Sequence, residues 1–290
     1  MFSICIPVYN TDCSLLLDTL KMQINHLNKQ IEVIVADDCS TVFTNTNIST
    51  CEKHGFKYIT NKQNIGRIAT RLKLATESNS DYILFVDADM LPKNKSFLKI
   101  YLSFQLKSDK IPVFGGYCYN YKKSNNLRLN YGKQREEVNL SMRKKFPYRY
   151  VFSGNFLINR DLFLLVSERI PQGYGMDICF SAILKNKGIK ISHIENPTIH
   201  TGLETNIIFL KKIKNASSNL HLIAETSEID FSHTKLISFS NFLNRMALTN
   251  FLCFLLKIMA PITLYALKRF GKPLLFIDIY RLHCFLNYKK

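Results

Sequence analysis

The sequence predicts an α/β fold: a mostly parallel central sheet flanked by helices, with a helical C-terminal extension. Short apolar runs typical of buried strands alternate with segments of helical periodicity over residues 2–194. Two of these runs end in paired aspartates, and from residue 207 onward the pattern is helical. Alternating strands and helices are typical of parallel sheets. We therefore expect two domains, residues 1–205 and residues 206–290.

The individual elements follow from the same patterns. The expected strands are residues 2–9, 31–36, 57–60, 82–86, 151–158 and 189–194, and the expected helices are residues 13–28, 68–78 and 176–186. Residues 118–149 are polar, basic and rich in Asn and Tyr, which favours a loop or mobile flap. We expect the C-terminal helices to be interrupted at Pro261 and at Gly271-Lys272-Pro273.

The charge is unevenly distributed. The chain has 290 residues, 39 Lys+Arg, 22 Asp+Glu and a net charge of +17, and it is 47% hydrophobic, which excludes a disordered protein. The excess lies in residues 122–149 and 205–290. Such an excess indicates nucleic acid, an anionic membrane or simply a solvated face. No helix-turn-helix, RNA-binding or zinc-finger signature is present, so we expect no nucleic-acid partner.

The cysteines and the N-terminus indicate the compartment. The eight cysteines are scattered without a CxxC pair or a Cys/His cluster, so no zinc site is expected. The chain enters a strand pattern at once and has no basic residue before Lys21, unlike a secretory signal. Residues 246–256 form the longest late charge-free stretch, shorter than the ~20 residues of a spanning helix. We expect a cytoplasmic protein that is not a polytopic membrane protein.

Two carboxylates follow the apolar run at residues 82–86. In Asp87-Ala88-Asp89 the two aspartates are two positions apart, so they point to the same face of an extended chain. In a parallel sheet, ligands bind beyond the carboxyl ends of the strands. Carboxylate oxygens there can hold a hard divalent cation such as Mn²⁺ or Mg²⁺. The alternative is a solvated turn.

Other polar groups fall near the same expected edge. Asp37-Asp38 ends an earlier strand, and its carboxylates can accept hydrogen bonds from a nucleoside; an Asx turn or a helix cap is the alternative. Arg67 and Arg71 lie four residues apart on an expected helix, hence on one face. They suit phosphate oxygens, with a surface ion pair as the alternative.

Ordered motifs extend over residues 2–204. They lie at residues 6–10, 35–40, 64–71, 85–89, 153–155, 173–177 and 193–204. Together they resemble the motifs of family 2 glycosyltransferases of the GT-A fold, in a bacterial, Bacteroidetes-type branch. The resemblance implies that a nucleotide-sugar contacts Pro7, Tyr9, Asp37, Asp38, Asn64, Gly66, Arg67, Arg71 and Asp87. It also implies that Asp87, Asp89 and His200 hold Mn²⁺ or Mg²⁺.

The resemblance further implies an inverting, metal-dependent transfer of a sugar, from a UDP-sugar to a saccharide or lipid-linked acceptor in bacterial surface polysaccharide synthesis. Asp177 matches the catalytic base, which would deprotonate the acceptor hydroxyl. The sequence departs from the family pattern at two places. Asp177 is followed by Ile178 where a second acid is usual, and Cys39 stands where glycine is usual.

Two other functions stay open. A sugar-nucleotide nucleotidyltransferase would want a glycine-rich basic loop after the first strand, where this chain has residues 10–13, Asn-Thr-Asp-Cys. A non-catalytic, membrane-associated nucleotide-binding protein would keep the site without turnover.

The C-terminal helices combine apolar faces with basic flanks. Residues 236–259 carry a polar stripe of Asn241, Arg245 and Thr249, and residues 274–288 show a second apolar face. This pattern favours helices that lie in a membrane interface with anionic lipid. The alternatives are packing on the catalytic domain and a homodimer. We expect a peripheral location at the inner face of the cell membrane.

Overall fold

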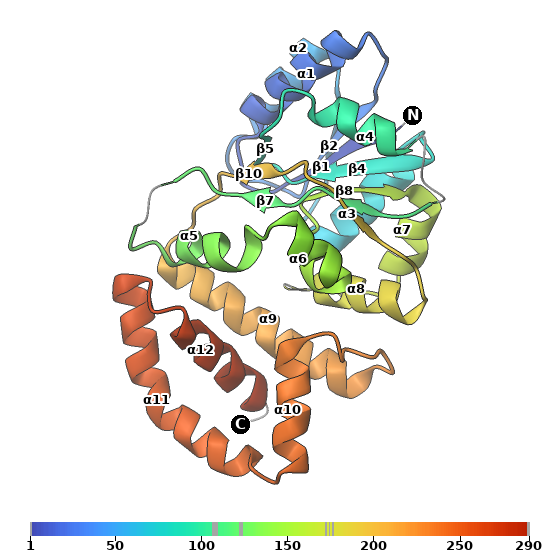
Figure 1. Cartoon of the computed structure of the whole chain (residues 1–290). Coiled ribbons are helices and arrows are strands. Elements are labelled where there is room, and N and C mark those ends of the chain that lie inside the picture. The colour runs from blue at the N-terminus through green and yellow to red at the C-terminus, as the bar shows by residue number, and fades with distance from the viewer. Residues whose placement is uncertain are drawn as a thin grey trace. The chain divides into compact units, whose positions relative to one another are not determined.

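The computed structural model describes residues 2–105, 110–121, 124–171, 173, 175 and 177–288 (Figure 1). It divides into two compact units. Unit 1 comprises Met1–Asn120, Val138–Gln172 and Ile189–Gly202, and unit 2 comprises Tyr121–Glu137, Gly173–Gly188 and Leu203–Lys290. The predicted α/β class is confirmed, with a central sheet in unit 1 and helices at the C-terminus. The domain boundary after residue 205 stays a prediction.

Among the described residues, the central sheet of unit 1 has seven strands in the order β3-β2-β1-β4-β8-β6-β9. The strands are β1 (Phe2–Val8), β2 (Val33–Asp37), β3 (Lys57–Thr60), β4 (Tyr82–Val86), β6 (Val113–Phe114), β8 (Asn155–Asn159) and β9 (Ser192–His193). The first four in chain order run parallel, and β8 is antiparallel to β4 and β6. Val8 pairs with Asp37 and Asp37 with Thr60, so the carboxyl ends of β1, β2 and β3 are level.

A smaller sheet lies in the same unit. Its strands are β5 (Met90–Pro92), β7 (Tyr117–Cys118) and β10 (Thr198–His200), in the order β5-β10-β7 among the described residues. His200 pairs with Met90, so the start of β5, just after Asp89, lies beside the end of β10. The sequence patterns do not predict this sheet, because strands of two or three residues are too short to show an alternation.

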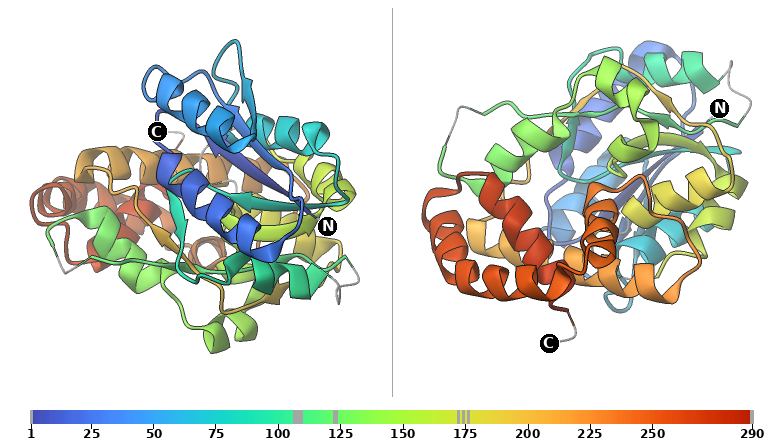
Figure 2. Two further views of the ribbon diagram at one scale, coloured as in Figure 1. Left: turned by 90° about the horizontal axis from the view of Figure 1, so that it is seen from above. Right: turned by 60° about the horizontal axis from the view of Figure 1, so that its bottom comes forward.

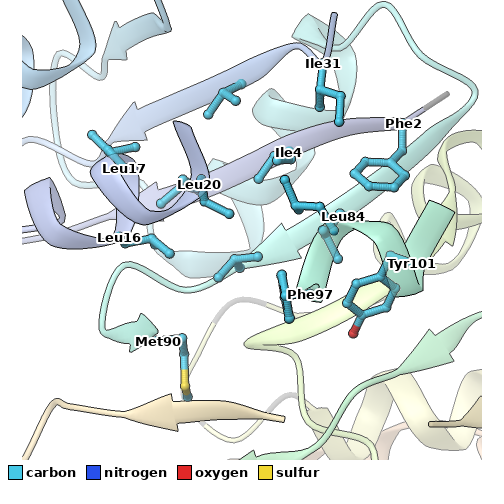
Figure 3. Close-up of a cluster of buried hydrophobic side chains, with 14 of the residues drawn as sticks. Phe2, Ile4, Leu16, Leu17, Leu20, Ile31, Leu84, Met90, Phe97 and Tyr101 are labelled. Carbon is cyan, nitrogen blue, oxygen red and sulfur yellow. The ribbon is translucent and has the colours of Figure 1, made fainter. Parts of the chain in front are cut away.

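Helices α1 (Ser14–Leu27) and α3 (Arg67–Glu77) confirm two predicted helices. The other helices of unit 1 are α2 (Thr44–His54), α4 (Phe97–Gln105), α6 (Leu140–Lys145), the 3₁₀-helix η2 (Pro147–Tyr150) and α7 (Arg160–Ser167). Figure 3 shows the core between the sheet and α1 and α4, where Leu16, Leu20 and Phe97 meet side chains of β1 and β4. This core fixes the strand ends on which the candidate site is built.

The prediction of a loop over residues 118–149 is wrong. Apart from residues 122 and 123, which lie outside the described part, the segment holds α5 (Leu127–Tyr131), the π-helix η1 (Gly132–Glu136), α6 and η2. The Asn126 side chain accepts a hydrogen bond from Leu129 N, and Asn139 accepts one from Met142 N. These N-caps allow short polar segments to begin helices despite their weak apolar periodicity.

Unit 2 consists of helices in its described part. Besides α5 and η1 they are α8 (Asp177–Asn186), α9 (Asn206–Thr226), α10 (Lys235–Arg245), α11 (Thr249–Phe270) and α12 (Leu275–Leu286). α12 packs against both α9 and α11, as the right-hand view of Figure 2 illustrates. Their shared core includes Phe209, Leu267 and Ile277. The predicted helix at residues 176–186 is confirmed for its described residues; Met176 lies outside them.

Two details of the C-terminal prediction are wrong, and one is confirmed. α11 continues through Pro261, because its packing on α12 and α9 compensates for the lost backbone bond. The helix does end at Gly271, which adopts a left-handed φ of 62°. The predicted polar stripe is broken, since α10 ends at Arg245 and Thr249 begins the next helix.

One helix among the described residues, α11, is long and apolar enough to cross a membrane by length and composition. Its 22 residues include Lys257, so a count of charge-free residues alone underestimates its length. Core helices of soluble proteins can pass the same test.

Candidate active site

Asp37, at the end of β2, is completely buried. Its carboxylate accepts hydrogen bonds from Ser40 N at 2.7 Å and from the Tyr58 hydroxyl at 2.6 Å. Burial, and secondly this contact with Asp37, raises the pKa of Tyr58. Asp37 therefore fixes the turn after β2 and joins it to β3, and both hydrogen bonds are to groups of the protein itself.

Asp38 holds the loop that leads into α3. Its carboxylate accepts hydrogen bonds from Asn61 Nδ2 at 2.9 Å, Ile65 N at 2.8 Å and Gly66 N at 2.9 Å. Gly66 has a φ of 85°, which glycine adopts without strain. Asn64 is exposed on the same loop. The structure thus brings together Asp38, Asn64 and Gly66, and their contact with a nucleotide-sugar stays a prediction.

The chain after β1 is tied to the chain after β2. Asn10 N donates to Ser40 Oγ at 2.8 Å, and Asn10 Oδ1 accepts from Thr41 N at 2.7 Å. Tyr9, directly after Pro7-Val8, is 51% exposed beside this junction. An exposed aromatic ring held on a fixed loop suits stacking against a planar ligand.

Arg67 and Arg71 lie on one face of α3, as their spacing predicts, and both reach Asp87 at the end of β4. Arg71 Nη2 bonds Asp87 Oδ1, and Arg67 Nη2 lies 3.2 Å from Asp87 Oδ2. Burial by itself would raise the pKa of Asp87, but Arg71, Arg67 and, to a lesser degree, His200 hold the pKa below its ordinary value. Asp87 is therefore a buried carboxylate that stays ionised and is already paired.

The segment before β8 passes close to this pair. Arg71 Nη2 also donates to the Ser153 carbonyl at 3.0 Å. Within the described residues, the buried Arg71 Nε and Ser153 Oγ have no hydrogen-bond partner. A Cβ on Gly154 would lie 2.5 Å from the Tyr117 hydroxyl and 2.9 Å from Asp87 Oδ2, so only glycine fits here.

Asp89 and His200 form the second half of the site. Asp89 Oδ2 lies 3.6 Å from His200 Nε2, and the Asp89 carbonyl accepts from Thr201 N at 2.8 Å. A Cβ on Gly202 would collide with the Asp89 carboxylate. The Tyr119 ring stacks on His200 with centroids 5.5 Å apart and planes 18° apart. The imidazole is thus held in one plane beside a partly exposed carboxylate.

The donor set fits a divalent cation. A carboxylate oxygen and an imidazole nitrogen 3.6 Å apart can both reach one ion, and this mixed set suits Mn²⁺ better than Mg²⁺, which prefers oxygen alone. No group of three or more His, Cys, Asp or Glu gathers in the described part of the chain. The protein would supply Asp89 and His200, and other ligands would fill the remaining positions. Asp87 as a third ligand stays a prediction, because its oxygens contact Arg67 and Arg71.

The predicted base belongs to the other compact unit. Asp177 is the first residue of α8 and is partly exposed. In the motif at residues 173–177, Tyr174 and Met176 lie outside the described residues. Gly175 has a φ of 86°, and its backbone approaches Ala216 of α9 so closely that a Cβ would collide. The role of Asp177 stays a prediction.

Some residues of the site are not predicted individually. Ser153, Gly154 and Gly202 lie inside motifs at residues 153–155 and 193–204, so the motifs could have pointed to them. Tyr117 and Tyr119 lie on or beside a two-residue strand, and no local pattern marks them. Asn155, from the same motif as Ser153, is fully buried and bonds Tyr101 and two backbone carbonyls, which makes it a structural residue.

Comparisons with known proteins identify the family of the chain. The family described as glycosyl transferase family 2 matches residues 3–165, more than half of the chain. No curated protein matches.

Solved structures show a similar fold. Glucosyl-3-phosphoglycerate synthase from Mycobacterium tuberculosis, in complex with Mn²⁺, UDP and glucosyl-3-phosphoglycerate, has a TM-score of 0.54 at 16% identity, over 76% of this chain and 78% of that chain. S. aureus TarS 1–349 in complex with UDP-GlcNAc has a TM-score of 0.52 at 16% identity, over 97% of this chain and 90% of that one. Another S. aureus TarS structure, with a TM-score of 0.54 at 19% identity, is matched over 84% of this chain and only 43% of its own length. The chain belongs to glycosyl transferase family 2 and is a glycosyltransferase with the GT-A fold.

Proposed function

We propose that the protein is an inverting, metal-dependent glycosyltransferase that moves a sugar from a UDP-sugar to a saccharide or lipid-linked acceptor in bacterial surface polysaccharide synthesis. The observation that carries the proposal is the Asp89–His200 pair, 3.6 Å apart, next to an Asp87 carboxylate paired with two arginines. The two aspartates follow β4 and His200 ends β10. The site thus lies beyond the carboxyl end of the parallel strand β4, where α/β sheets bind ligands.

Asp89 and His200 hold the cation in this proposal, and Arg67 contacts the diphosphate. The Arg67 guanidinium is half exposed, so it can contact a phosphate oxygen while Arg71 remains paired with Asp87. When bound, Mn²⁺ or Mg²⁺ would neutralise charge that develops on the departing diphosphate. The structures of similar fold that contain UDP with Mn²⁺ or Mg²⁺ support the choice of donor and metal.

The nucleoside is proposed to contact the loops after β1 and β2. Tyr9 offers an exposed ring for stacking, and Pro7 lies two residues before it, near the end of β1. Asp38 accepts three hydrogen bonds inside the protein, and a carboxylate has about four acceptor positions, so it retains room for one from the nucleoside. Asp37 contributes indirectly, because its buried carboxylate shapes the turn.

Asp177 is proposed as the base that takes the proton from the acceptor hydroxyl. The oxygen of that hydroxyl then forms a bond to the anomeric carbon as the bond from that carbon to UDP breaks. Attack from the side opposite UDP inverts the configuration. The proposed place of reaction is the cytoplasm at the inner face of the membrane, and a homodimer stays a hypothesis.

The nucleotidyltransferase hypothesis is less favoured. Residues 10–13 lack the glycine-rich basic loop that would bind a triphosphate, and hydrogen bonds fix them: Asn47 accepts from Cys13 N at 3.0 Å and donates to the Thr11 carbonyl at 2.9 Å. A non-catalytic binding protein would have the same site, so only a measurement of turnover distinguishes it from an enzyme.

The decisive experiment measures UDP release from a panel of UDP-sugars in the presence of Mn²⁺. Asp89→Asn should reduce the rate by roughly 10²–10³-fold, the effect of losing a group that stabilises transition-state charge. Asp177→Asn should reduce it by roughly 10²–10⁴-fold. The matched control is Asp81→Asn, an exposed aspartate just before β4, which should stay within about twofold.

A thermal-shift measurement separates binding from turnover. UDP with Mn²⁺ at ~100 Kd should stabilise the wild type by about 2.7 kcal/mol, and Asp89→Asn should lose most of this gain. If UDP binds but no acceptor mixture leads to release of UDP from a UDP-sugar, the non-catalytic hypothesis would be favoured. Full activity in Asp177→Asn would remove Asp177 from the mechanism, and no shift with UDP and Mn²⁺ would reject the nucleotide site.

A further inference from the structure

Helix α11 carries a row of large apolar side chains that face solvent. The row, which we call the α11 face, consists of Phe251, Phe254, Ile258, Ile262 and Tyr265, and each side chain is 57–67% exposed. Successive members are three or four residues apart, so they lie on one side of the helix. Exposed apolar residues scattered singly are normal, but a continuous row indicates a surface that meets another apolar phase.

The opposite side of α11 is firmly held within unit 2. Cys253, Leu256 and Leu267 are buried there, where α11 packs on α9 and α12. Asn206 Nδ2, at the start of α9, donates to the carbonyls of Leu267 and Lys268 at 3.3 and 3.0 Å. A helix that crossed a bilayer would have to give up these contacts. The structure therefore favours a helix that lies on a membrane over one that spans it.

The charged residues of α10, α11 and the link to α12 are all cationic. Between Lys235 and Ile277 the chain has six Lys and Arg residues and no Asp or Glu. Lys257, Lys268 and Arg269 of α11 are exposed. Two copies of this chain joined through the α11 face would bring like charges together, which is unfavourable. A bilayer with anionic headgroups satisfies both the apolar row and the cations.

The other predicted membrane helix does not share this property. Ile277, Tyr280 and Phe285 of α12 are buried in the core of unit 2, as is Leu274 just before it. Most of the apolar pattern at residues 274–288 thus serves packing within the unit.

We propose that α11 lies in the headgroup region of an anionic bilayer, parallel to the surface, with the α11 face toward the acyl chains. Apolar side chains inserted in this way provide affinity in proportion to their buried area, and the flanking cations add attraction to anionic lipid. This surface is independent of sugar transfer, and its test measures binding rather than activity.

The test is flotation of the full chain with vesicles of phosphatidylcholine alone or mixed with phosphatidylglycerol. We expect binding to the mixed vesicles that is at least about tenfold stronger than to phosphatidylcholine, since each cation near the surface contributes. Raising the salt to ~0.5 M should weaken this binding, because salt screens the attraction. Equal binding to both vesicles, or none to either, would overturn the proposal.

Matched variants locate the surface. Phe254→Asn with Ile258→Asn should weaken binding by at least about tenfold, because two large apolar side chains no longer insert. The control is Leu15→Asn on α1, an equally exposed leucine in unit 1 at 61%, which should bind like the wild type. Lys268→Gln with Arg269→Gln should weaken binding to the mixed vesicles only. Unchanged unfolding midpoints would show that the variants are folded.

Two further measurements address the other occupants of the α11 face. Light scattering should give the same molar mass for the wild type and for the Phe254→Asn, Ile258→Asn variant. A wild-type dimer that becomes a monomer in this variant would assign the surface to a second copy. Alkaline carbonate should release the protein from membranes, whereas retention would indicate a spanning helix.

Discussion

The candidate active site of unit 1 and the α11 face of unit 2 differ from ordinary proteins in opposite ways: the first buries charged side chains, and the second exposes apolar ones. At the first, the polar residues Asp38, Arg71 and Asp87 are at most 5% exposed. At the second, apolar residues such as Phe254 and Tyr265 are more than 60% exposed. Charged residues are rarely buried unless they are paired, and rows of exposed apolar side chains are unusual in monomers.

The difference between the two regions lies in what compensates each departure. Asp87 meets Arg67 and Arg71, and Asp38 meets two backbone N–H groups and an amide, so the burial of these charges is explained within unit 1. The α11 face has no such compensation in the described part of unit 2. Buried charges that are paired within the protein help to build its site. Exposed apolar side chains that nothing in the protein covers indicate a surface for an external partner.

The largest effect is expected from breaking the buried pair. Arg71→Met should lower the free energy of unfolding by about 3–5 kcal/mol, because it leaves the buried Asp87 carboxylate with the half-exposed Arg67 as its remaining ion-pair partner. The double variant Arg71→Met, Asp87→Leu should recover part of the loss. Urea unfolding at neutral pH measures both.

The control for this pair is an exposed ion pair of the same unit. Lys57→Met removes a contact of 2.7 Å with Glu77 in which both side chains are more than 40% exposed, and it should change stability by less than about 1 kcal/mol. If Arg71→Met lost no more stability than Lys57→Met, the buried Asp87 carboxylate would not depend on Arg71 for its stability.

A pair of substitutions on α11 sharpens the contrast between its two sides. Leu267→Ala, at a fully buried position, should cost about 2–5 kcal/mol. Phe254→Ala should stay within about 0.5 kcal/mol, because its ring is exposed and adds little to the packing of unit 2. Urea unfolding compares them, and similar losses in both variants would mean that the α11 face is covered in the folded protein.

A third prediction concerns pH and a buried histidine. Burial, chiefly, lowers the pKa of His193 to about 4, although a hydrogen bond of 2.9 Å to the Pro147 carbonyl opposes the shift. Between its ordinary pKa of about 6.5 and pH 4, the unfolded chain binds a proton that the folded chain does not. This histidine should therefore contribute a loss of stability of about 3 kcal/mol as the pH falls through this window.

The measurement is the free energy of unfolding at several pH values for the wild type and His193→Gln. The variant should lose the part of the dependence between pH 6.5 and 4 that His193 contributes, and His26→Gln, at an exposed position, should keep it. A His193→Gln profile parallel to the wild type would contradict the assignment.

The smallest effect is expected at the turn after β2. Cys39 has a left-handed φ of 63°, which glycine adopts more readily. Cys39→Gly should relieve this strain but make the unfolded chain more flexible, so its net effect should stay within about 1 kcal/mol. The melting temperature is a sufficient readout, and a change well beyond this range would show that the side chain itself matters for the fold.

The parts of the site that could be predicted are those with a local signal. Asp87 and Asp89 follow a five-residue apolar strand, and Arg67 and Arg71 have helical spacing, so their placement follows from periodicity. Tyr119 and His200 come together only because β7 and β10 pair across eighty residues of sequence. No local pattern encodes that pairing.

The elements missed in the fold have a similar explanation. α2 is polar on most of its surface and buries only Asn47 and Cys51, so it shows almost no apolar periodicity. Helices α5 and α6 begin at the N-caps Asn126 and Asn139, and the polar composition of this segment alone does not predict them. Pro261 predicts an interruption of the helix, but the packing of α11 overrides this local preference.

The exposure of one cysteine gives this protein a built-in chemical reporter. Of the eight thiols, all in the described chain, seven are buried and Cys39 is partly exposed. Burial raises the pKa of Cys13, Cys51 and Cys179 to about 12, which keeps these thiols protonated and slow to react. A maleimide should therefore modify Cys39 first. Because Cys39 lies next to Asp38, the rate of that modification would register any ligand that settles on the turn after β2, without a label introduced from outside.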